Sequence, residues 1–389
     1  MGGLPKRNFG FALRLAGLYA AIFVMTGVQL PFFPVWLKAK GLDAQMIGAV
    51  LAIPMFVRVF AIAGVARAAD RTGRLRAAIV AASCASLIGT ILVGLADGAS
   101  AIIATYTLAS LAFAPVLPLT ETYALRGLGA RGQAYGPVRL WGSAAFIAGN
   151  FAAGFAADAL PARHLIWLIV AAMLFGVVAS LTLAPLPLAA APVAAQARRG
   201  RSLLRDPAFI AVLAAASLIQ ASHAVYYGFS ALQWRGAGLD GSAVAALWAL
   251  GVAAEIVLFA ISGRLPPALT PIVLIMIGAV GAVVRWTVMA FDPPVALLPP
   301  LQLLHALSFG ATYLGALNLV ARSAPPGQGA SAQGYLAIAT GVAMAAAMSV
   351  SGLLYAAFGG AAYAAMALAA VAGGICALVA DRLGRRMPL

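Results

Sequence analysis

Residues 41–64 read GLDAQMIGAVLAIPMFVRVFAIAG, and residues 238–262 read GLDGSAVAALWALGVAAEIVLFAIS. Both stretches begin with Gly-Leu-Asp and continue into an apolar run that carries one charge near its middle. The offset of 197 residues that aligns them places Arg58 opposite Glu255. A duplicated unit of this kind is typical of transporters whose two halves move around a central site. The repeat therefore predicts two pseudo-symmetric halves.

The composition places the chain in a membrane. The 389 residues are 63% hydrophobic and only 9% charged, whereas soluble domains are about 25% charged. Apolar runs of roughly 20 residues cross a bilayer as helices, and these runs are too long for the strands of a barrel. We therefore predict an all-α membrane protein with twelve transmembrane helices, at residues 12–37, 44–66, 76–96, 99–124, 135–158, 164–186, 208–233, 242–263, 270–291, 296–321, 329–355 and 360–380.

The net charge of +15 is a topology signal. Of the 25 Lys and Arg residues, 18 lie in the N-terminus, the even-numbered loops and the C-terminus, and four lie in the odd-numbered loops. The positive-inside rule then predicts that both termini are cytoplasmic, in a bacterial inner membrane. No nucleic-acid partner is needed to explain the charge. The longest polar interruption, residues 187–207, predicts a cytoplasmic linker between six-helix bundles at residues 1–186 and 208–389.

The loop after the second expected helix reads ADRTGRLR, residues 69–76. It resembles the signature loop of the major facilitator superfamily, with Asp70, Arg71, Gly73, Arg74 and Arg76 at matching positions. Gly73 allows a tight turn, and Asp70 can pair with arginines or with a helix N-terminus. The resemblance implies the major facilitator fold and a cytoplasmic gate at Asp70, Arg71, Gly73 and Arg74. The alternative is a basic turn that only sets topology.

Ionisable residues inside membrane helices are rare and usually face a cavity or a partner. The sequence has seven, namely Arg58, Glu121, Arg139, His223, Glu255, Arg285 and His305. Glu121 and Arg139 lie on antiparallel neighbouring helices, and we expect them to meet at similar depth. The polar and aromatic residues that share one helical face with Arg139 are Ser143, Phe146 and Asn150. The alternatives are side chains that reach the interface and buried ion pairs without a transport role.

The seventh expected helix carries QASHAVYYGFSALQW, residues 220–234. His223 shares a face with Tyr227, and its neighbours are polar or aromatic. We expect both side chains to line a cavity. Further aromatic surface is expected from Trp141, Tyr226, Phe229 and Trp286.

The charged set resembles the branch of the superfamily that includes lactose permease. That resemblance implies matching roles for Glu121, Arg139, Phe146, Glu255, Arg285 and His305. Ser308 stands where that branch has a proton-carrying acid, so the proton-coupling role of that acid does not carry over to this chain. The chain more closely resembles the phenylpropionate permease family along nearly its whole length, as in YGPVRLWGSAAF from Tyr135 and LQLLHALSFG from Leu301.

These resemblances imply proton-coupled uptake of a small aromatic carboxylate, such as 3-phenylpropionate. An arginine fork binds a carboxylate through two parallel hydrogen bonds. The expected substrate-binding residues are Glu121, Arg139, Phe146, Asn150, His223, Tyr227 and Arg285. The expected proton-coupling residues are Glu255, His305 and Arg58.

Other functions remain open from the sequence. A sugar or nucleoside symporter, an efflux carrier and a non-transporting membrane sensor are alternatives. Paired catalytic carboxylates, HExxH, GxSxG and a phosphate-binding Walker loop are missing, so we expect no enzyme. The two cysteines favour neither a disulfide framework nor a metal site. We expect a functional monomer that needs no cofactor and uses the proton gradient.

Overall fold

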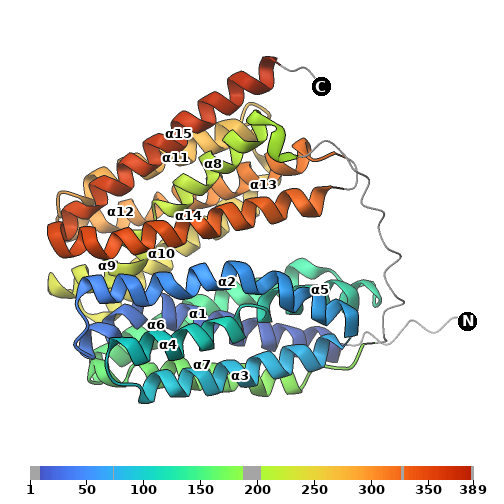
Figure 1. Ribbon diagram of the computed structural model, residues 1–389, viewed down its shortest axis with the longest axis vertical. Coiled ribbons are helices and arrows are strands. Elements are labelled where there is room, and N and C mark those ends of the chain that lie inside the picture. The colour runs from blue at the N-terminus through green and yellow to red at the C-terminus, as the bar shows by residue number, and fades with distance from the viewer. Residues whose placement is uncertain (1–8, 73, 187–202, 326–327, 387–389) are drawn as a thin grey trace, which may run out of the picture. The chain divides into compact units, whose positions relative to one another are not determined.

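The computed structural model describes the backbone of residues 9–72, 74–186, 203–325 and 328–386, and the same side chains except those of residues 9, 59–72, 330, 385 and 386. Every regular element in this part of the chain is helical, which confirms the predicted all-α class. Figure 1 shows the α-helices. They are α1 (Phe9–Ala39), α2 (Ala44–Thr72), α3 (Leu75–Leu95), α4 (Ala99–Phe113), α5 (Val116–Gly129), α6 (Tyr135–Ala159), α7 (Ile166–Leu181), α8 (Pro207–Ala221), α9 (Ala224–Gly236), α10 (Gly241–Ile261), α11 (Pro271–Met289), α12 (Leu298–Leu303), α13 (Thr312–Ser323), α14 (Gly329–Phe358) and α15 (Tyr363–Arg386).

Short irregular helices connect several of these elements. A π-helix, η5 (Ala306–Ala311), lies between α12 and α13. The 3₁₀ turns are η1 (Ala162–His164), η2 (Leu203–Arg205), η3 (Ser262–Arg264), η4 (Val295–Leu297) and η6 (Gly359–Ala362).

The helices are long and apolar enough for a multi-pass membrane protein. Within the described residues, ten helical segments qualify by length and composition. One of them, Ser331–Gly384, has 54 residues and covers most of α14 and of α15. The first part of α2, Ala44–Arg58, is also apolar. The number of twelve crossings stays a prediction.

Three expected spans consist of separate helical pieces. The span at 99–124 divides into α4 and α5 next to Pro115, which has no backbone N–H to continue a helix. The span at 208–233 divides at Ser222 and His223, and the Ser222 hydroxyl donates to the Ile219 carbonyl at 2.6 Å. The span at 296–321 contains η5. Two of these irregular segments carry residues of the candidate site.

Contacts between Cα atoms divide the chain into two compact units. The first comprises residues 1–40 and 60–192, and the second comprises residues 41–59 and 193–389. The first part of α2 therefore groups with the second unit. The predicted boundaries at 187–207 stay a prediction, since residues 187–202 lie outside the described part of the chain.

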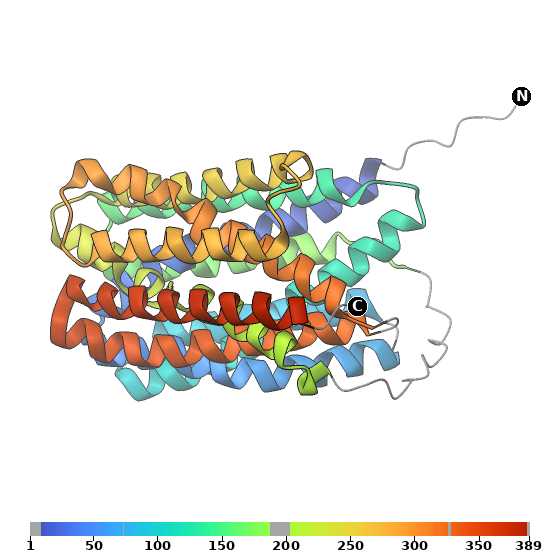
Figure 2. The ribbon, with the colours of Figure 1, turned by 90° about the horizontal axis from the view of Figure 1, so that it is seen from above.

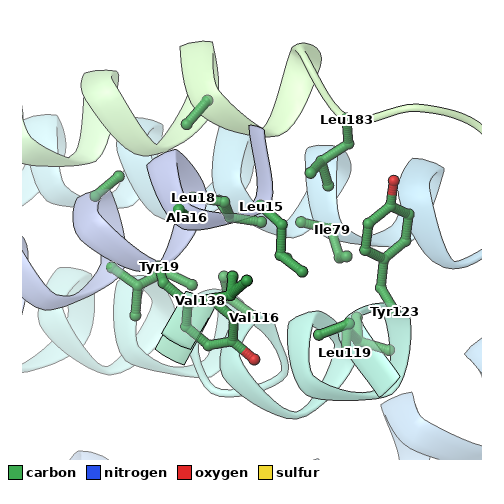
Figure 3. Close-up of a cluster of buried hydrophobic side chains, with 14 of the residues drawn as sticks. Leu15, Ala16, Leu18, Tyr19, Ile79, Val116, Leu119, Tyr123, Val138 and Leu183 are labelled. Carbon is green, nitrogen blue, oxygen red and sulfur yellow. The ribbon is translucent and has the colours of Figure 1, made fainter. Parts of the chain in front are cut away.

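In the first unit, α1 packs against α6 and α7, and α3 packs against α4, α5 and α7. Figure 3 shows part of its core, where Leu15 and Tyr19 of α1 meet Val116 and Tyr123 of α5. Glycines let α1 and α6 approach closely. A Cβ on Gly27 would overlap backbone atoms of Phe146 and Asn150. The hydrophobic effect does not drive helices together inside a lipid bilayer. Close van der Waals packing at small residues therefore stabilises the association of membrane helices.

In the second unit, α8 packs against α14 and α15, and α11 packs against α13 and α15 (Figure 2). α10 packs against α12 and η5. A Cβ on Gly251 of α10 would lie 3.3 Å from His305 Cβ and 3.4 Å from the Gln302 carbonyl oxygen. This glycine lets α10 come close to the segment that carries the candidate site.

Candidate functional site

Arg285 of α11 lies at the centre of a buried polar cluster in the second unit. Its side chain is fully buried, and its Nη2 donates to Gln302 Oε1 at 2.6 Å. Nη1 lies 3.1 Å from His305 Nδ1. The guanidinium carbon is 4.5 Å from the ring centres of both Tyr226 and Trp286. Hydrogen bonds and aromatic faces therefore hold the guanidinium in one position.

The contact with Arg285 decides which ring nitrogen of His305 carries the proton. A guanidinium only donates, so Nδ1 of His305 must accept. The proton of the neutral ring then lies on Nε2. Nε2 is 3.6 Å from Glu255 Oε2, on α10. The arrangement thus points an N–H group at a carboxylate that is only 18% exposed.

His223 belongs to the same cluster through Ser308. Nδ1 of His223 lies 3.2 Å from the Ile219 carbonyl and 3.1 Å from the Gln220 carbonyl, so Nδ1 donates. Nε2 then accepts from the Ser308 hydroxyl at 3.2 Å, and that oxygen lies 3.5 Å from Arg285 Nη1. Ser308 is part of the π-helix η5, and single π turns often occur at functional positions. The serine links the histidine to the arginine.

Aromatic rings surround this cluster. Tyr227 stacks on His223 with ring centres 5.7 Å apart, and Trp248 stacks on Tyr226 at 4.5 Å. Trp286 stacks on Tyr363 at 5.6 Å. The Trp286 indole donates to the Ser222 hydroxyl at 2.9 Å. Beyond its polar partners, Arg285 is thus surrounded by aromatic rings and closed to water.

A second and more open cluster lies in the first unit. Arg139 Nε of α6 is 3.8 Å from Glu121 Oε1 of α5, and the two side chains are 30% and 42% exposed. The Tyr135 hydroxyl donates to the same carboxylate oxygen at 3.2 Å. The guanidinium carbon of Arg139 lies 4.2 Å from the Phe23 ring centre and 5.6 Å from that of Tyr19, both on α1. This cluster therefore offers a cation beside aromatic surface and within reach of solvent.

The other residues of the predicted α6 face lie deeper. Phe146 and Asn150 are buried, and Ser143 is half-buried. Phe146 and Asn150 are at the close approach of α6 to Gly27 of α1. Their assignment to a substrate cavity stays a prediction. Trp141, expected to add aromatic surface, is 59% exposed.

The remaining predicted residues belong to α2 and to the beginning of α3, and several of them cannot be placed in full. Arg58 is exposed on α2. Asp70 and Arg71 lie on α2 outside the described side chains, and Gly73 lies outside the described residues altogether. Arg74 is exposed at the N-cap of α3. The predicted gate stays a prediction.

Several contributors were not expected from the sequence, among them Gln302, Trp248, Phe23 and Tyr19. Gln302 provides the shortest hydrogen bond to Arg285. It lies three residues before His305 and so shares its helical face, which is a usable signal. Trp248 had no comparable signal. Within the described residues, no group of three His, Cys, Asp or Glu side chains could hold a metal ion.

Comparison with known proteins identifies the class of this chain. Residues 12–365 match the sequence profile of the MFS_1 like family. The chain belongs to the MFS_1 like family. It is 32% identical over 371 residues to a protein of Escherichia coli (strain K12) named as a probable 3-phenylpropionic acid transporter, covering 91% of this chain and 93% of the relative. As a member of this family, the protein is a membrane transporter of the major facilitator type and not an enzyme.

Other matches to this MFS_1 like chain are more distant. It is 26% identical over 311 residues to the maltose permease of Geobacillus stearothermophilus, covering 79% of this chain and 78% of the relative. A mutant of nucleoside transporter NupG has a TM-score of 0.82 at 18% identity, with coverage of 96% and 99%. A bacterial homologue of the lysosomal transporter Spinster has a TM-score of 0.77 at 14% identity, with coverage of 99% and 98%. These structures support the fold alone.

Proposed function

We propose that this transporter carries a small aromatic carboxylate such as 3-phenylpropionate into the cell together with a proton. Twelve membrane helices in two six-helix halves would alternate access to a central site. The positive-inside distribution supports an inner-membrane protein with both termini cytoplasmic. The loop at residues 69–76 would act as the cytoplasmic gate, and the functional form is a monomer.

The observation that carries this proposal is the setting of Arg139. Its guanidinium lies beside Phe23 and Tyr19 and is 30% exposed. The contact with Glu121 uses Nε, and we expect the substrate carboxylate to take the edge formed by Nη1 and Nη2. The aromatic rings would then contact the phenyl group of the substrate. The relative named for 3-phenylpropionic acid supports the same substrate class.

The proton would travel through the second unit. Arg285 holds His305 so that Nε2–H faces Glu255. We propose that Glu255 accepts the proton, since a carboxylate can carry one. His305 can take up a proton only on Nδ1, so it passes one on only in a state in which Arg285 has released that nitrogen. Ser308 cannot take the place of an acid, but its hydroxyl can relay a hydrogen bond to His223.

A sugar symporter is the second candidate, because a maltose permease is among the relatives. The deciding experiment is uptake into proteoliposomes driven by an inward proton gradient. Labelled 3-phenylpropionate, maltose and uridine are compared, with protein-free liposomes to correct for leakage of the neutral acid. We expect accumulation of 3-phenylpropionate that a protonophore abolishes. Accumulation of maltose or uridine alone would replace the carboxylate proposal.

A matched pair of variants tests the role of Arg139 in the same assay. Arg139→Lys keeps the charge but removes the fork, whereas Arg163→Lys makes the same change at an exposed residue of η1. We expect Arg139→Lys to raise the KM about tenfold or more, because one of two charge-assisted hydrogen bonds is lost. Arg163→Lys should transport normally. An unchanged KM in Arg139→Lys would remove the two-point contact from the proposal.

A further inference from the structure

An open groove runs between three helices of the first unit. Its lining comes from α1, from the end of α7 with the residues that follow it, and from Arg76 at the beginning of α3. α1 and α3 each pack against α7 (Figure 1). Its volume is about 720 Å³. Leu183, which follows α7, forms part of the inner wall and packs into the core shown in Figure 3. The groove is separate from the cluster around Arg139.

The outer wall of the groove is apolar and exposed. Leu13 is 70% exposed, Phe175 44%, Val178 52% and Leu181 53%. In a membrane protein, such residues on the outside of a helix bundle face lipid chains. A single acyl chain is the occupant that fits this wall.

Two arginines lie at one end of the groove. Arg14 Nη1 donates to the Thr182 carbonyl at 3.2 Å, and Arg76 Nη2 donates to the Leu181 carbonyl at 3.0 Å. Arg76 Nε is buried and has no hydrogen-bond partner. In each arginine, one guanidinium nitrogen is used to cap the C-terminal end of α7. The other N–H groups of the two guanidinium groups are not used in this cap. The described residues that line the groove include no Asp or Glu to accept hydrogen bonds from them.

The position of these arginines along the helices matches the level of lipid headgroups. Arg14 lies near the beginning of α1, Arg76 near the beginning of α3, and Leu181 is the last residue of α7. All three helix ends therefore meet where the apolar spans stop. Basic pockets between membrane helices at this level bind anionic headgroups.

We propose that this groove binds one anionic phospholipid, with its phosphate on Arg14 and Arg76 and an acyl chain along Leu13, Phe175 and Val178. The phosphate takes the guanidinium N–H groups that capping leaves over, and the chain covers the apolar wall. The positive-inside rule places this end in the cytoplasmic leaflet. The proposal does not depend on which substrate is transported.

Native mass spectrometry of the purified full chain tests it. The protein is equilibrated with equal amounts of phosphatidylglycerol and phosphatidylcholine, and retained adducts are counted. We expect one phosphatidylglycerol to be retained about tenfold or more over phosphatidylcholine, from attraction to two arginines. The double variant Arg14→Gln/Arg76→Gln should lose this preference. The double variant Arg205→Gln/Arg322→Gln removes two exposed arginines elsewhere and should keep it.

Two further arms keep the test decisive. Val178→Trp leaves both arginines in place and fills the groove, so it should also lose the phosphatidylglycerol adduct. This variant provides the test if the double arginine variant does not fold. Glycerol 3-phosphate carries the phosphate without chains and should not compete. No preference for phosphatidylglycerol in the wild type, or an unchanged preference in either groove variant, overturns the proposal. Competition by glycerol 3-phosphate would point to a free phosphate and overturn the lipid.

Discussion

The guanidinium of Arg285 is fully buried among Gln302, His305 and two aromatic rings, whereas that of Arg139 is 30% exposed beside one carboxylate at 3.8 Å. A buried charge must be held by nearby polar groups, because removal from water is costly. A half-exposed charge can exchange water for a ligand. We therefore propose different tasks for the two arginines. In this proposal, Arg285 organises the proton-carrying groups and Arg139 binds the substrate.

The largest effect that this comparison predicts is on stability. Arg285→Gln leaves Gln302 and His305 without their donor inside the protein, which should lower the Tm by several degrees and abolish uptake. Arg139→Gln should abolish uptake but keep the Tm within about 2 °C, because exposed ion pairs contribute little. Thermal unfolding in detergent measures both. Equal losses of Tm would erase the distinction.

The next effect separates transport from coupling. Glu255→Gln keeps the size of the side chain but cannot carry a proton. We expect accumulation of 3-phenylpropionate against a gradient to disappear, while exchange of labelled for unlabelled substrate continues. Exchange serves as the internal control for folding. Accumulation at the wild-type level in Glu255→Gln would show that Glu255 is not the proton carrier.

A smaller effect tests the packing that brings α10 to His305. Gly251→Val adds a side chain where even a Cβ lies 3.3 Å from His305. It should move Glu255 away from the imidazole and reduce gradient-driven uptake several-fold. Gly236→Val is the control, since a Cβ there has nothing within 4 Å. If both variants behave alike, the close approach of α10 is not important for coupling.

The smallest effect concerns the first unit. Tyr135→Phe removes the hydroxyl that donates to Glu121 and leaves the ring in place. This hydrogen bond goes to a carboxylate that is 42% exposed, so we expect it to contribute about 1 kcal/mol and the KM to change by about tenfold at most. The proton coupling, which we assign to the second unit, should not change. A loss of coupling in Tyr135→Phe would mean that Glu121 takes part in it.

The sequence alone predicted the helical class and the membrane location, because apolar length and charge distribution encode them directly. The family followed from the resemblance of stretches such as ADRTGRLR and YGPVRLWGSAAF. The sequence also singled out Glu121 with Arg139, and Arg285 with His305 and Glu255, which the structure places together within each cluster.

The sequence could not predict how each helix is rotated about its axis. Membrane helices are apolar on the face toward lipid and on the face toward protein, so periodicity says little about direction. Phe146 and Trp141 were both expected at a cavity, yet one is buried and the other is 59% exposed. No proline lies at the helix break at His223 or within η5, so the sequence did not indicate these irregular segments. Gln302 is uncharged and was therefore not selected as a candidate site residue.

The division of tasks between the two arginines is tested most directly by one binding comparison. Binding of 3-phenylpropionate and of its uncharged amide, 3-phenylpropionamide, is measured by competition against the labelled acid in the wild type, Arg139→Gln and Arg139→Lys. If Arg139 binds the carboxylate, the wild type prefers the acid about tenfold or more, and Arg139→Gln binds acid and amide alike. A preference for the acid that persists in Arg139→Gln would contradict the account and place the carboxylate elsewhere.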